Sequence, residues 1–66
     1  MLIAVAIFDP PNATAKYRAW RAEHNDVMKQ IPPDDVRIDV GRAVGGDFVR
    51  VSVAQSYAER FFGSGS

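Results

Sequence analysis

The chain has 66 residues, in which eight basic residues balance eight acidic ones, with one histidine and no cysteine. This composition excludes disulfides, leaves few ligands for a metal ion, and lacks the basic field of a nucleic-acid-binding protein. A chain of this size buries only about 60% of the surface that its unfolded form exposes, so small domains often gain stability by oligomerisation. We therefore expect one compact domain, residues 1–62, that associates with copies of itself.

The two ends of the chain carry no targeting signal that we recognise. Residues 63–66, Gly-Ser-Gly-Ser, resemble the remnant of a linker and are left out of the fold prediction. The apolar run near the N-terminus is too short to span a bilayer and has no basic residue before it. These features predict a cytoplasmic protein with no membrane partner.

Residues 2–8, LIAVAIF, are predicted to form a strand, and none of their side chains is polar. Strand side chains point alternately to the two faces of a sheet, so this strand needs apolar cover on both faces. Strict alternation places Leu2, Ala4, Ala6 and Phe8 on one face, and Ile3, Val5 and Ile7 on the other. We expect a second copy to supply the missing cover, with a dimer interface that contains Leu2, Ala4, Val5, Ala6 and Phe8.

A long helix is predicted to follow, from Asn12 to about Gln30. Asn12 is expected to cap it through its side chain, and Pro32 to end it, because the residue before a proline avoids the helical region. One apolar stripe recurs at three- and four-residue steps along this helix and its end: Tyr17, Trp20, His24, Val27, Met28 and Ile31.

Residues 36–40 and 49–53 alternate between apolar and polar, which predicts a β-hairpin with Gly45-Gly46 as its turn. This turn pairs Val44 with Asp47, Val40 with Val51, and Ile38 with Val53. All the valines and isoleucines of both strands then share one face.

The last segment begins with Ser56 and Glu59, which have the spacing of a capping box. A short helix is therefore expected there, with Tyr57 and Phe61 one turn apart on the same side.

The predicted fold is α+β, in the order β-α-β-β-short α. It has a three-stranded, mainly antiparallel sheet with the long helix on one face, as in half of a ferredoxin-like fold. By its order of elements, the segment 2–62 resembles the ferredoxin-like unit of dimeric α+β barrel proteins, which implies two sheets packed face to face. No fourth strand is predicted here, so residues 2–8 also form a candidate edge, and edge-to-edge dimerisation is the alternative.

Two residues are candidates for catalysis. His24 is the side chain that titrates near neutral pH, and Asp9 is a carboxylate next to the first strand. The helix separates them by roughly 18 Å at 1.5 Å per residue, so they form no dyad within one copy. Asp34 and Asp35 fit a solvated turn better than a metal site, and we expect neither a metal nor a cofactor.

The candidate binding residues fall into three groups. A polar stripe of the long helix is basic near the helix start, where cations oppose the dipole; arginines lie on the two hairpin strands, and an aromatic pair lies at the end of the short helix. These residues are Arg18, Arg21, Asn25, Arg37, Arg50, Phe61 and Phe62.

We therefore favour a small non-enzymatic protein–protein interaction module, of the regulator or inhibitor type, that acts as a homodimer on an unidentified protein partner. The alternative is a cofactor-free enzyme or small-ligand binder of the dimeric α+β barrel kind, with His24 or Asp9 as its polar group. Nucleic-acid binding through the arginines is the least favoured hypothesis.

Overall fold

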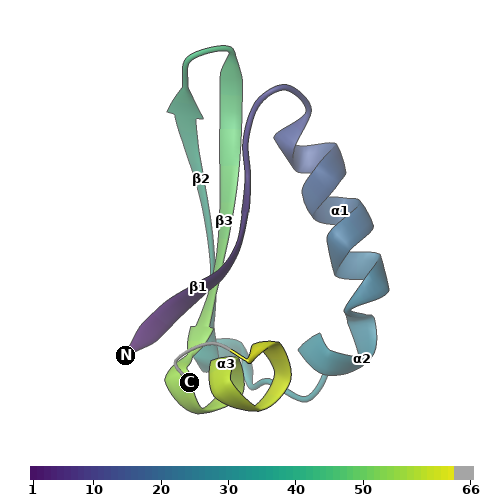
Figure 1. The fold of residues 1–66 in the computed structure, drawn as a ribbon, viewed down its shortest axis with the longest axis vertical. Coiled ribbons are helices and arrows are strands. Elements are labelled where there is room, and N and C mark those ends of the chain that lie inside the picture. The colour runs from purple at the N-terminus through teal and green to yellow at the C-terminus, as the bar shows by residue number, and fades with distance from the viewer. Residues whose placement is uncertain (64–66) are drawn as a thin grey trace.

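A computed structural model of the chain describes residues 1–63. The elements are β1 (Leu2–Phe8), α1 (Ala13–Glu23), α2 (Asn25–Met28), the 3-10 turn η1 (Pro33–Asp35), β2 (Val36–Ala43), β3 (Gly46–Ala54) and α3 (Gln55–Phe62). The strands form one antiparallel sheet in the order β1-β3-β2, with α1 along one side (Figure 1). The predicted α+β fold is thus confirmed. Apart from Gly63, the predicted linker lies outside the described residues.

Strand β1 does not alternate strictly as predicted, because its register with β3 shifts between Ala4 and Ala6. A β-bulge of this kind sets two residues opposite one and changes the phase of the side chains that follow. Ala6 and Phe8 therefore pair with Val51 and Val49, on the face covered by the helices. The opposite face of β1 carries Leu2, Ala4 and Ile7, which is neither of the two predicted sets.

The hydrophobic core lies between the sheet and the helices. Val49, Val51 and Val53 of β3 are almost completely buried, because β3 is the central strand and α1 packs mainly against β3 and β1. The apolar stripe predicted for the long helix faces this core as expected. Its members there include Tyr17, Trp20, Val27, Met28 and Ile31.

The predicted single helix is interrupted at His24, which separates α1 from α2. The carbonyl oxygen of Trp20 accepts two hydrogen bonds from His24, one from its backbone N–H at 3.0 Å and one from its Nδ1 at 2.9 Å. A side chain that bonds a helix carbonyl competes with the backbone ladder and disturbs the helix. His24 accordingly leaves the helical region, with φ −104° and ψ 19°.

The hairpin register differs from the prediction by two residues. Ala43 pairs with Gly46, so the turn is formed by Val44 and Gly45, and the positive φ of Gly45 (92°) suits its second position. A shift of two residues keeps every side chain on its predicted face. The observed register sets Gly41 opposite Phe48, whose ring occupies the space where a Cβ on Gly41 would lie.

Neither predicted side-chain cap forms. Asn12 precedes α1 in the left-handed region, with φ 62°, and its side chain makes no capping bond. A capping residue normally has an extended backbone, which is the conformation that lets its side chain reach the free N–H groups of the helix. Helix α3 begins at Gln55, directly after β3, so Ser56 is already inside the helix and the predicted capping box is wrong. Gln55 bonds the Glu59 side chain instead, at 3.1 Å.

Candidate interaction surface

The face of the sheet opposite the helices is bare. Its side chains follow from the pairing of the strands: Leu2, Ala4 and Ile7 from β1, Phe48, Arg50, Ser52 and Ala54 from β3, and Arg37, Asp39 and Gly41 from β2. We call this set the bare face. An antiparallel sheet with one solvated face usually shows polar residues there, but the part contributed by β1 is wholly apolar.

The apolar part of the bare face is exposed to water. Ile7 has 59% of its surface exposed, and Leu2 is also exposed. Phe48 lies flat enough to cover Gly41 and remains half-buried. Exposed apolar side chains on one face of a sheet are typical of a contact surface.

An ionic cluster lies on the β2 side of the bare face. Asp39 accepts a hydrogen bond from Arg37 Nε at 3.0 Å and another from Arg50 Nη2 at 3.4 Å. Two cations thus share one carboxylate, which leaves one positive charge in excess. Exposed pairs of this kind add little to stability but orient charged partners.

The two candidate catalytic residues lie at opposite ends of α1. The His24 ring stacks on the Trp20 ring, with their centroids 4.4 Å apart. The Phe62 ring also stacks on His24, with centroids 5.9 Å apart and an angle of 26° between the ring planes. The Nδ1 of His24 donates to the Trp20 carbonyl of α1, and its ring contact with Phe62 joins the end of α1 to α3. Asp9 is exposed beside the start of α1, and its backbone oxygen accepts from Lys16.

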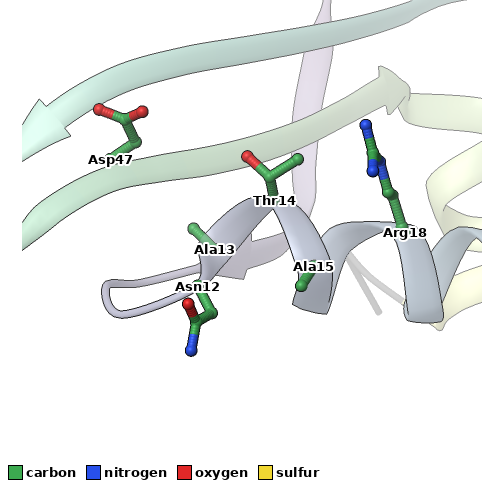
Figure 2. Close-up of a pocket in the computed structure, with 6 residues that line it drawn as sticks. All are labelled: Asn12, Ala13, Thr14, Ala15, Arg18 and Asp47. Atoms are coloured by element: carbon green, nitrogen blue, oxygen red, sulfur yellow. The ribbon is translucent and has the colours of Figure 1, made fainter.

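The basic helix residues point in different directions. Arg18 projects toward the sheet above a shallow hollow of about 380 Å³, across which lies Asp47, whereas Asn12 points away (Figure 2). Arg21 donates to the Tyr17 hydroxyl at 2.8 Å, and Asn25 is exposed at the start of α2. The structure therefore does not unite them with the sheet arginines Arg37 and Arg50.

The terminal aromatic pair takes part in packing. Phe62 stacks on Trp20 at 6.0 Å, which ties α3 to α1. Phe61 stacks on Tyr57 at 6.2 Å, as the one-turn spacing predicted, and Arg60 lies over its ring at 5.8 Å. Both phenylalanines remain half-buried.

A second hollow, an open groove of about 440 Å³, runs between the helices and β2. Met28, Ile31, Val36 and Ile38 give this groove an apolar lining, and Arg21 and Lys29 add positive charge to it. Because α1 lies over β3 and β1, Val40 of β2 is 65% exposed although it points to the helix side.

Within residues 1–63, no three His, Cys, Asp or Glu side chains gather closely enough to hold a metal ion. None of the helices described is long and apolar enough to cross a membrane. Comparison with known proteins gives no match to a family model, to a curated protein or to a solved structure.

Sequence reasoning included Arg37 and Arg50 among the candidate binding residues but left out Asp39, which pairs with both of them. It also left out Ile7 from the proposed dimer interface, although Ile7 is the most exposed large apolar residue of the bare face. The strand alternation of residues 36–40 could have identified Asp39. Nothing in the sequence signals the bulge that exposes Ile7.

Proposed function

We propose that this chain is a non-enzymatic protein–protein interaction module that acts as a homodimer and holds a protein partner against the bare face of its sheet. One observation carries this proposal. The helices cover a single face of the sheet, and the other face presents Leu2, Ile7 and Phe48 beside a charged cluster. An apolar patch rimmed by charges is the usual composition of a protein contact surface.

The placement of His24 supports the same proposal. Its ring packs against the rings of both Trp20 and Phe62, and its Nδ1 is engaged with a backbone carbonyl. A general base needs a free nitrogen aimed at a substrate pocket, and His24 lines neither of the two hollows described above. We therefore favour binding over the alternative of a cofactor-free enzyme.

Sedimentation equilibrium between 1 and about 500 µM tests the homodimer. We expect the mass to approach twice that of one chain with rising concentration, because the exposed apolar surface favours association. A monomer mass over the whole range would contradict the homodimer.

The partner-binding surface is tested with a photo-crosslinker introduced at Ile7 and, as a control, at the exposed Ala19 of α1. We expect Ile7 to capture a partner that Ala19 does not. The purified partner should then bind Ile7→Lys at least tenfold more weakly than Ala19→Lys, at equal melting temperature, because the new charge lies in an apolar contact. Equal binding by the two variants would show that the bare face is not the contact surface.

A further inference from the structure

Both outer strands of the sheet have free edges, but the two edges differ. Strand β1 is interrupted by its bulge, which shifts its register between Ala4 and Ala6. A bulge protects an edge from pairing with another chain. Strand β2 pairs with β3 without interruption over Val36–Ala43, and it contains neither lysine nor proline. The regular, uninterrupted edge is therefore that of β2.

The direction of the free backbone groups of β2 follows from the register. The Gln55 N–H points to β1. Because backbone groups alternate in direction along a strand, the N–H and C=O groups of the odd residues of β3 point to β1 and those of the even residues point to β2. The two-residue turn agrees, because it closes on a hydrogen-bonded pair, Ala43 and Gly46. The N–H and C=O groups of Val36, Ile38 and Val40 consequently point outward from the sheet.

The five residues 36–40, Val-Arg-Ile-Asp-Val, match a second copy of the same segment when the two run antiparallel. Two antiparallel copies centred on Ile38 set valine opposite valine, isoleucine opposite isoleucine, and Arg37 opposite Asp39 at both ends. Outward groups at the even residues allow this register, with about six backbone hydrogen bonds. Centring the pairing on residue 37 or residue 39 instead would set two Arg37 or two Asp39 residues opposite each other, which is destabilising.

We propose that two copies of this chain pair antiparallel along β2, centred on Ile38, so that the two sheets become one. This rests on the proposed homodimer and specifies its interface. The pairing gives the exposed side chains of Ile38 (38%) and Val40 (65%) apolar neighbours, and adds a cross-strand opposite charge to the Arg37–Asp39 ion pair that each copy already contains. Because paired residues point to the same side, both bare faces join into one surface roughly 29 Å across at about 4.8 Å per strand.

Charge reversals test this pairing, because Arg37→Asp and Asp39→Arg each create two like-charge contacts in a homodimer. We expect each variant alone to self-associate at least tenfold more weakly than the wild type. In an equal mixture, one variant presents two carboxylates where the other presents two guanidinium groups. The mixture should therefore form a heterodimer with close to wild-type affinity, measured by sedimentation with one variant labelled.

A second pair leaves the Asp39 cluster intact, in case Asp39→Arg fails to fold. Ile38→Lys and Ile38→Glu should each be monomeric and should associate when mixed, since residue 38 faces itself. Arg60→Asp, at an exposed position of α3 and with the same charge change as Arg37→Asp, is the control for the charged variants and should remain dimeric.

The outcomes separate this proposal from the broader one. A wild-type monomer overturns both the homodimer and the β2 pairing. A wild-type dimer that persists in all four folded β2 variants overturns the β2 pairing alone, as does a mixture of folded variants that stays monomeric.

Discussion

The two faces of the sheet use the same strands for different purposes. Along β3, Val49, Val51 and Val53 are buried beneath the helices, while Phe48, Arg50 and their neighbours alternate with them on the bare face. The covered face supplies nearly all the apolar burial of this small domain. The exposed residues of the bare face are consequently free to change with little cost to folding, which is the property that a contact surface needs.

The largest difference between the faces is expected for an introduced carboxylate. Val51→Asp should unfold the domain, because an unpaired buried charge costs several kcal/mol against a total stability of about 5 to 15 kcal/mol. Ile7→Asp, on the bare face, should change stability by less than about 1 kcal/mol. Urea unfolding followed by circular dichroism measures both. A folded Val51→Asp variant of near wild-type stability would contradict this division.

A cavity beneath the helices should have the next largest effect. Phe62→Ala removes the ring that stacks on Trp20 and His24, and we expect a loss of about 2 to 3 kcal/mol. Phe61→Ala removes a ring that packs beside Tyr57, and should cost about half as much. Thermal melting would measure the two variants together, and equal losses would show that α3 is not anchored through Phe62.

His24→Gln should cost about 1 kcal/mol, because it removes the stacked ring from between α1 and α3. The dissociation constant of the homodimer should not change, since His24 lies on the covered side. Chemical denaturation and sedimentation of one preparation provide both values. Loss of a measured catalytic activity in this folded, dimeric variant would favour the enzyme hypothesis over ours.

The smallest effect is expected on the bare face itself. Phe48→Ala uncovers Gly41 and removes one cross-strand contact of the hairpin, which should cost about 0.2 to 1 kcal/mol. Hydrogen exchange of β2 amides should become faster, whereas that of β1 amides should not. Unchanged exchange in β2 would indicate that the Phe48 ring does not hold the register.

Most elements could be predicted because local patterns determine them: the alternation of the hairpin strands, the apolar stripe of α1, and the proline that follows Ile31. The remaining features depend on tertiary structure or on competition between hydrogen bonds. The bulge in β1 follows no residue signal, and the interruption at His24 arises from its bond to the Trp20 carbonyl. The hairpin register was wrong by two residues because both registers place the same side chains on the core.

The candidate site was less accessible to sequence reasoning than the fold. The self-complementary segment 36–40 is visible in the sequence, but its use requires knowing that β2 is an outer strand with a regular edge. The sequence directed attention to residues 2–8 instead, because their apolar run is more prominent. The structure shows that part of this run, including Phe8, is used within the core of one copy.

The hydrogen bond between Gln55 and Met1 brings the beginning of the chain next to the first residue of α3, one short helix from Gly63. Joining residues 1 and 63 by a flexible loop is therefore feasible without crossing either face of the sheet. The turn residue Val44 is fully exposed, so the chain can be reopened there. Such a circular permutant would exchange the hairpin for an ordinary strand pair, and would place any fused protein at the end of the sheet farthest from α3.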